Sequence, residues 1–181
     1  MASFHVSSPG RRQLLRAGAT AALTVGVASL GGCGFALRQA PKFAFTSLQV
    51  SGAMGGAARA LQREIGSAGI QVVTAARPAG DTAPPQVVLT VLIDQRERVV
   101  VGKLANGQVR ELQLRYRFRF RLATPAGKTL LEEDEILLER DISFSETAVL
   151  AKAAEEQTMF NDMQGDVVQQ VMRRLASVKL V

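Results

Sequence analysis

Three long segments in which apolar and polar side chains alternate constrain the fold of this chain more than any other feature. They run from Val87 to Lys103, from Gln108 to Ala123 and from Thr129 to Phe144, and short glycine-containing turns join them. Successive side chains of a strand point to opposite faces of a sheet, so this alternation predicts strands with one apolar face. The three segments therefore predict an antiparallel meander.

Two further segments have the spacing of amphipathic helices. In the first, from Met54 to Ala68, apolar residues recur at intervals of three and four, and Gly69 is placed to end the helix in a left-handed conformation. The second runs from Ser145, a predicted N-cap, to about Ala176. Its apolar stripe, which we expect to be buried, consists of Phe160, Met163, Val167, Val171 and Leu175.

Shorter strands are expected at Phe43–Val50 and Ile70–Thr74. A sheet with one apolar face and two amphipathic helices bury their apolar surfaces together when both helices lie on that face. The sequence therefore predicts an α+β fold. We expect a two-layer sandwich whose mostly antiparallel or mixed sheet has four to five strands, with two helices packed on one face.

The turns between the long segments determine which side chains face one another across the meander. Asn106-Gly107 favours a two-residue type I′ turn, which requires positive φ at both central positions. That turn places Arg98 opposite Arg115 and Arg96 opposite Arg117. The analogous turn at Ala126-Gly127 gives two further pairs on the other side: Glu132 with Arg121, and Asp134 with Arg119.

Four arginines of the middle segment alternate with apolar residues and so share its polar face: Arg115, Arg117, Arg119 and Arg121. In the predicted register, acidic residues neutralise the last two, whereas Arg96, Arg98, Arg115 and Arg117 face one another. Like charges in opposite positions are destabilising, and guanidinium groups suit bidentate contacts with phosphate. Two interpretations stay open, an anion-binding stripe or an ordinary neutralised surface, and a one-residue change of register would remove the argument for the first.

The N-terminal segment has the organisation of a bacterial lipoprotein signal peptide. In order, a basic n-region, an apolar h-region and small residues precede a cysteine: Arg11 to Arg16, Ala17 to Leu30, and Gly31-Gly32 before Cys33. We expect removal of residues 1–32 and acylation of Cys33, which leaves one domain of residues 33–181 anchored to a membrane by lipid. The n-region fits a general secretory signal and a twin-arginine signal equally well.

This processing limits the chemistry of the mature domain. The only cysteine is acylated and the only histidine, His5, is removed, so neither a thiol nor an imidazole remains for nucleophilic catalysis or metal binding. The acidic run Glu132–Glu135 is a candidate for carboxylate-based hydrolysis of envelope polysaccharide, but neighbouring residues of a strand point to opposite faces. We therefore expect no enzyme activity, no cofactor and no metal ion.

Several short motifs, taken in order, resemble the LPS-assembly lipoprotein family LptE. They are the lipobox with Cys33-Gly34-Phe35-Ala36-Leu37-Arg38, a first strand and helix, the Asn106-Gly107-Gln108 hairpin, Leu150-Ala151-Lys152, Glu155-Glu156 and Asn161-Asp162-Met163. Gly34 after the cysteine, in place of aspartate, is similar to the sorting pattern of outer-membrane lipoproteins. Ala105 stands where better-known members have a basic residue, although Lys103 and Arg110 flank the turn.

The resemblance implies a lipid-anchored protein on the periplasmic face of the outer membrane that plugs an LptD-type β-barrel, assists its assembly and binds lipopolysaccharide. Candidate lipopolysaccharide-binding residues are Arg96, Arg98, Arg115, Arg117, Lys103 and Lys152. Export and acylation argue against nucleic acid as the anionic partner. The alternative is a periplasmic lipoprotein chaperone or scaffold that binds a protein and no lipid.

Overall fold

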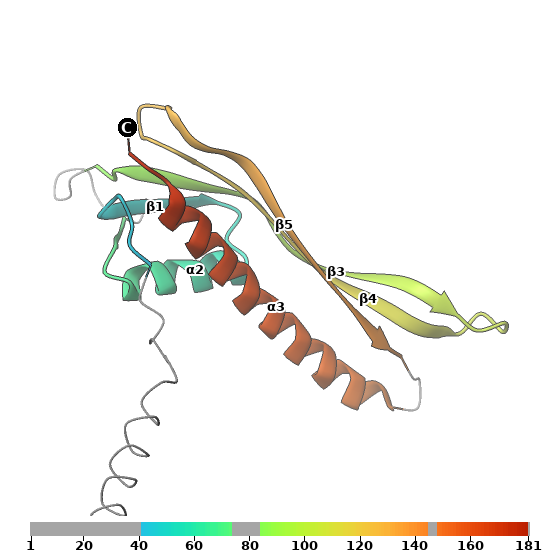
Figure 1. The fold of residues 1–181 in the computed structure, drawn as a ribbon. Coiled ribbons are helices and arrows are strands. Elements are labelled where there is room, and N and C mark those ends of the chain that lie inside the picture. The colour runs from blue at the N-terminus through green and yellow to red at the C-terminus, as the bar shows by residue number, and fades with distance from the viewer. Residues whose placement is uncertain (1–40, 74–83, 145–147, 181) are drawn as a thin grey trace, which may run out of the picture. The chain divides into compact units, whose positions relative to one another are not determined.

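The computed structural model describes residues 41–73, 84–144 and 148–180, all within the unit Ala40–Val181. The predicted signal peptide and Cys33 lie outside these residues. In the described part, five strands and two helices follow one another along the chain (Figure 1). Their bounds are β1 (Ser47–Gly52), α2 (Gly56–Ser67), β2 (Gln71–Val73), β3 (Val87–Lys103), β4 (Val109–Ala123), β5 (Thr129–Ser143) and α3 (Val149–Ser177).

The strands form one mixed sheet in the order β2-β1-β3-β4-β5. The pairs β3–β4 and β4–β5 are antiparallel, which confirms the predicted meander, whereas β1 runs parallel to both β2 and β3. Alternation along β4 gives the sheet its apolar face, and six side chains of that strand are buried: Leu112, Leu114, Tyr116, Phe118, Phe120 and Leu122.

Both helices cover this apolar face, as predicted (Figure 1). The five predicted stripe residues of α3, from Phe160 to Leu175, are all buried. Helix α2 ends in a Schellman motif, in which Ile70 N–H donates to the carbonyl of Ile65 and Gly69 N–H to that of Gly66. Gly69 has a φ of +84°, so the predicted left-handed residue is confirmed. Neither described helix is long and apolar enough to cross a membrane.

Two elements start three or more residues away from the prediction, whereas the other bounds differ by two residues or fewer. Strand β1 begins at Ser47 instead of Phe43, although Phe45, just before it, is buried in the core and explains the apolar pattern there. The N-cap of α3 is Ala148, which makes no side-chain capping bond, instead of Ser145, which lies outside the described residues.

Both hairpin turns have three residues instead of the predicted two. Leu104 and Gln108 close the first turn through a bond of 2.8 Å, and Thr124 and Lys128 close the second in the same way, also at 2.8 Å. The third loop residues, Gly107 and Gly127, have φ values of +85° and +86°, while no described residue other than glycine has positive φ. Asn106 therefore cannot occupy the first central position of a type I′ turn. The longer first loop shifts the pairing of β3 against β4 by one residue at Arg96 and Arg98. Register irregularities on both sides of Leu122 set the pairing of β5 against β4 one residue away from the prediction in the opposite direction.

Candidate functional site

The corrected register separates the arginines that were predicted to face one another. Arg96 lies opposite Tyr116 and Arg98 opposite Leu114, so both side chains project from the face that carries the helices. Arg115 lies opposite Glu97 on one side and Glu139 on the other, on the outer face. A one-residue shift moves every side chain of a strand to the other face. The predicted cluster of four arginines is therefore wrong.

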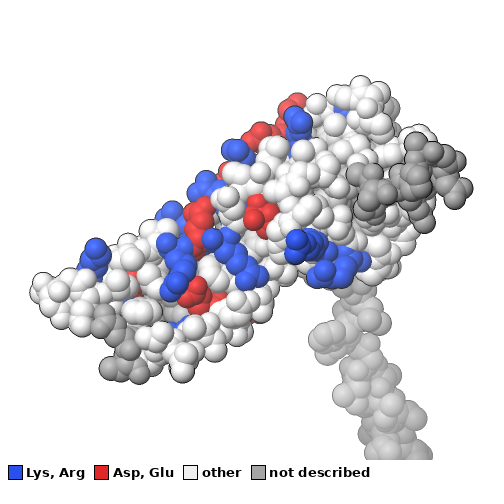
Figure 2. Space-filling model, turned by 180° about the vertical axis from the view of Figure 1, so that it is seen from behind, with Lys and Arg blue, Asp and Glu red and all other residues white. Residues whose placement is uncertain are grey.

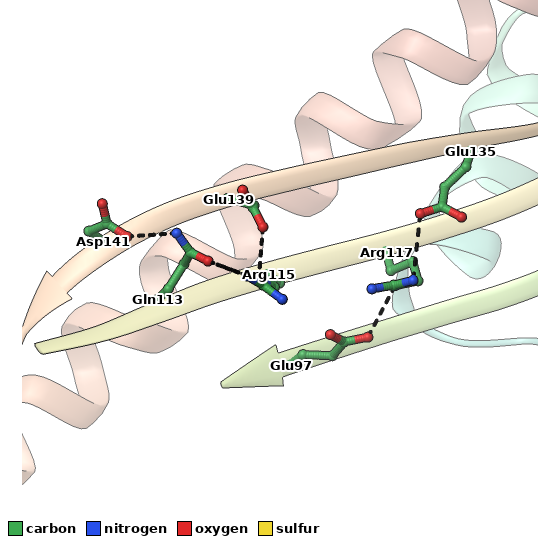
Figure 3. Close-up of polar contacts among 7 residues, drawn as sticks. All are labelled: Glu97, Gln113, Arg115, Arg117, Glu135, Glu139 and Asp141. Carbon is green, nitrogen blue, oxygen red and sulfur yellow. Dashed lines mark hydrogen bonds and ion pairs between the residues drawn. The ribbon is translucent and has the colours of Figure 1, made fainter. Parts of the chain in front are cut away.

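On the outer face, arginines and carboxylates form a ladder across three strands (Figure 3). Arg115 Nε lies 2.8 Å from Glu139 Oε1, and the same guanidinium donates to Gln113 Oε1 at 2.7 and 2.9 Å. Arg117 pairs with Glu97 at 3.2 Å and with Glu135 at 3.7 Å. We name these outer-face residues the ion-pair ladder. It corresponds to the second interpretation, a neutralised surface.

The pairs predicted at the other end of the meander also change. Arg119 pairs with Glu133 at 3.0 Å, not with Asp134. Asp134 lies opposite Phe120, so it faces the helices, where it pairs with Arg174 of α3. Arg121 lies opposite Thr90 and makes no ion pair with any residue that the structure describes. Figure 2 accordingly shows positive and negative side chains interspersed rather than one continuous basic stripe.

Arg96 is held against α3. Its guanidinium donates hydrogen bonds to Gln164 Oε1 at 2.9 Å and Asn161 Oδ1 at 3.3 Å. It also stacks over two aromatic rings, 5.8 Å from the centroid of Tyr116 and 5.4 Å from that of Phe160. Arg96 thus joins the sheet to the helix layer.

Beside Arg96, a buried network caps the first turn of α2 from the sheet. Tyr116 Oη donates to Asp94 Oδ1 at 2.8 Å and accepts from Ala57 N–H at 3.0 Å, while Asp94 Oδ2 accepts from Ala58 N–H at 2.9 Å. Burial, followed by the bond to Asp94, raises the pKa of Tyr116 to about 12. The residue that precedes the helix provides no side-chain cap, and Tyr116 and Asp94 instead accept hydrogen bonds from two of the free N–H groups of the first turn.

Arg98 and Lys152 meet at the start of α3. Both line a hollow of about 260 Å³, together with Phe144, Val149 and Glu156, which we name the α3 pocket. Arg98 Nε lies 3.1 Å from Glu156 Oε1, and Lys152 Nζ lies 2.8 Å from Glu155 Oε2. Two of the predicted binding residues thus share one pocket, and each pairs with a carboxylate near the start of α3.

Lys103 lies near this pocket, at the end of the β3–β4 hairpin. It lines a second hollow of about 360 Å³ with Arg110, Glu111 and Ser143. Ser143 Oγ also accepts a bond of 3.1 Å from Lys152 Nζ, so the second hollow adjoins the α3 pocket. Lys103 and Arg110 have no ion-pair partner in the described part of the chain. Three of the six predicted residues, Arg98, Lys103 and Lys152, therefore gather at one end of the domain.

Exposed apolar side chains surround the same basic residues. The hairpin reaches past the last residue of β5, since Ser143 pairs with Glu111 well before the turn (Figure 1). The face of this end that is visible at the left in Figure 2 is mostly uncharged, with few basic side chains. Its exposed large apolar residues are Val100, Val101, Leu104, Val149 and Leu150. We name this region, with the two hollows, the distal end.

Sequence reasoning missed the carboxylates that engage the distal cations and the network around Tyr116. The spacing of Lys152 and Glu155, three residues apart on a helix, is a signal that could have identified one ion pair. The contacts of Arg98 with Glu156 and of Tyr116 with Asp94 required the correct register. No group of metal-ligating residues occurs among the residues described.

A five-stranded mixed sheet with two helices on one face defines a non-repetitive α+β domain. The model of one family, described as LptE, lipopolysaccharide-assembly, matches residues 33–175. The chain belongs to the LptE family, as the motifs predict. A comparison with curated proteins finds no significant match.

Solved structures of bacterial lipoproteins share the fold. The solution structure of an uncharacterized lipoprotein B from Nitrosomonas europaea is 31% identical, with a TM-score of 0.64, over 80% of this chain and 91% of that one. The rare lipoprotein B from Shewanella oneidensis is 24% identical, with a TM-score of 0.57, over 72% and 94%. A minor lipoprotein from Acinetobacter baumannii shares the fold at 17% identity, with a TM-score of 0.58, over 76% and 97%.

Proposed function

We propose that this protein is a lipid-anchored component of the lipopolysaccharide-assembly machinery on the periplasmic face of the outer membrane. Cys33 carries the acyl chains, and the domain binds lipopolysaccharide without catalysing a reaction on it. The family match, which begins at Cys33, supports this role. The remaining support comes from the chemistry of the distal end.

The observation that carries the proposal is the combination of cations and exposed apolar surface at the distal end. Lipopolysaccharide presents phosphates beside acyl chains, and a surface that binds both needs basic groups next to apolar side chains. Arg98, Lys103 and Lys152 supply the first at two adjoining hollows, and Leu104 and Leu150 supply the second, with exposures of 43% and 88%.

The ion-pair ladder is a poorer binding site for phosphate. A phosphate that contacted Arg115 or Arg117 would have to displace Glu139, Glu97 or Glu135, and each of these arginines has a second polar partner within the ladder. Arg96 is committed to Asn161, Gln164 and two rings. We therefore place the lipopolysaccharide site at the distal end and not along the arginine stripe.

The protein partner in this proposal is an LptD-type β-barrel, which the domain plugs and helps to assemble. A barrel lumen is polar, and the ladder offers a polar surface of mixed charge that such a lumen accommodates. Affinity purification of the full-length protein from solubilised outer membranes should recover a large barrel protein in about equal amount. A Cys33→Ser variant, which cannot be acylated, is the control for anchoring. Recovery of no barrel protein would contradict the partnership.

A periplasmic scaffold that binds a protein and no lipid is the competing function. The carboxylates paired with Arg98 and Lys152 favour it, because they already neutralise two of the distal cations. The two functions differ in one measurement. If the barrel is recovered but purified lipopolysaccharide does not bind, the scaffold is correct; if both bind, the lipopolysaccharide-assembly role is correct.

A further inference from the structure

The start of α3 carries two adjacent carboxylates whose partners are both cations of the proposed lipopolysaccharide site. Glu155 Oε2 lies 2.8 Å from Lys152 Nζ, and Glu156 Oε1 lies 3.1 Å from Arg98 Nε. Only Lys152 and Glu155 belong to the same helix turn, whereas the Arg98–Glu156 pair joins the sheet to the helix. Two neighbouring acids thus neutralise two cations that come from different elements and line one pocket.

We propose that Glu155 and Glu156 set the affinity of the α3 pocket by competing with the ligand phosphate for Lys152 and Arg98. This inference rests on the proposed function. Phosphate binding there is an exchange, in which an oxygen of the ligand replaces a carboxylate oxygen at each cation. The carboxylates remain beside the pocket afterwards, and their charge then repels the bound phosphate. Both effects weaken binding.

The exposure of the four side chains agrees with an exchangeable arrangement. The Arg98 side chain is 55% exposed and Glu155 51%, so one member of each pair is open to solvent and to an incoming ligand. Lys152 and Glu156 are 22% and 18% exposed, so they are held in place by the pocket. Lys152 Nζ keeps a second partner, Ser143 Oγ at 3.1 Å, which can hold the ammonium when Glu155 is displaced.

A pocket of this kind suits a protein that takes up a ligand and passes it on. Arg98 and Lys152 without internal partners would hold a phosphorylated lipid more tightly and release it more slowly. Partly exposed ion pairs are worth little in stability, so ligand exchange at them costs little. Glu155 and Glu156 thus lower the affinity for a phosphorylated lipid and allow it to be released faster.

The test compares binding of purified lipopolysaccharide by the full-length protein and by Glu155→Gln, Glu156→Gln and the double variant. Glutamine keeps the size of the side chain and removes its charge. We expect the double variant to bind about fivefold more tightly and to release lipopolysaccharide more slowly. A fivefold change in affinity corresponds to about 1 kcal/mol, which is the repulsion between two unit charges about 4 Å apart in water. Glu133→Gln, which breaks the pair with Arg119 on the outer face, is the matched control and should leave binding unchanged.

The outcomes separate this inference from the function on which it rests. If the wild-type protein binds lipopolysaccharide and the double variant binds equally or more weakly, with its thermal midpoint preserved, the competition is refuted and the function stands. If the wild-type protein binds none, the proposed function fails. If Glu156→Gln unfolds the domain, Glu155→Gln alone tests the inference, because the Glu155 side chain is exposed and the proposed competition requires this variant to bind lipopolysaccharide more tightly than the wild type.

Discussion

Replacing Tyr116 with phenylalanine tests the network that joins the sheet to the start of α2. The hydroxyl donates to Asp94 and accepts from Ala57 N–H, and Tyr116 is 1% exposed. Its removal leaves a buried N–H and one carboxylate oxygen without that partner, and unsatisfied buried groups cost about 1–3 kcal/mol each. We expect Tyr116→Phe to lower the free energy of unfolding by about 2–4 kcal/mol, measured by urea denaturation.

The same hydroxyl makes stability depend on alkaline pH. Burial, and then the bond to Asp94, raises the pKa of Tyr116 to about 12 in the folded protein, against about 10 when unfolded. A raised pKa stabilises the folded state below pH 10, and this contribution disappears as the pH rises through the folded pKa. Between about pH 10 and 12, the wild-type protein should lose about 2–3 kcal/mol of its free energy of unfolding through the ionisation of Tyr116. Tyr116→Phe should not show this loss.

The chain makes this titration simple to read, because it contains one tyrosine and no tryptophan. Ultraviolet absorbance of the tyrosinate therefore reports Tyr116 alone. A titration midpoint near 10 in the folded protein would refute the buried network, as would a Tyr116→Phe variant with unchanged stability. Parallel loss of stability in both proteins above pH 10 would assign the pH dependence to other groups.

Three further substitutions test the fold and the outer face. Gly55→Ala should destabilise the domain by about 1–3 kcal/mol in thermal denaturation, because its Cβ would lie 2.5 Å from the Asp94 carboxyl carbon; Gly66→Ala, with open space around the added Cβ, is the control and should not destabilise. Arg117→Gln should lower the free energy of unfolding by about 1 kcal/mol or less, because the two ion pairs of Arg117 are partly exposed, and the effect should be smaller at high salt. A large, salt-independent decrease in denaturant titrations would contradict this. Gly107→Ala should cost about 1–2 kcal/mol, as its φ of +85° is unfavourable for a residue with a Cβ; an unchanged thermal midpoint would contradict the three-residue turn.

The strands and the helix stripes could be predicted from the sequence because each depends on local periodicity. The prediction Val87–Lys103 agrees with β3 at both ends. Strand β4 begins one residue later than predicted, and β5 ends one residue earlier. All five predicted stripe residues of α3 are buried, since a helix of this length has one face to bury, and two residues that were not predicted, Val168 and Met172, widen the stripe.

The register was not predictable from Asn106-Gly107 alone. The same two residues suit a two-residue turn with both at positive φ and a three-residue turn with only Gly107 in that conformation. The two turns differ by one residue, and that difference decides whether Arg98 faces Arg115 or Glu156. Local residue preferences do not separate them, whereas the contacts of Asp94 and Arg96 with Tyr116 on the helix-covered face do.

The candidate site was predictable in part for the same reason. Lys103 and Lys152 were identified through the family motifs and do not depend on the register of β3 against β4. Arg98 was named for a wrong reason, an opposing Arg115, yet it lies in the α3 pocket beside Lys152. Arg115 and Arg117 were correctly placed on the outer face, but their carboxylate partners come from strands whose register was one residue off.

The central claim is that lipopolysaccharide binds at the distal end and not at the arginines of the outer face. Two double variants with equal loss of charge test it directly: Arg98→Gln with Lys152→Gln, and Arg115→Gln with Arg117→Gln. Binding of purified lipopolysaccharide should weaken about tenfold in the first and change less than about twofold in the second, because charged hydrogen bonds to phosphate are lost only in the first. Equal weakening in both, or weakening only in the second, would contradict the account.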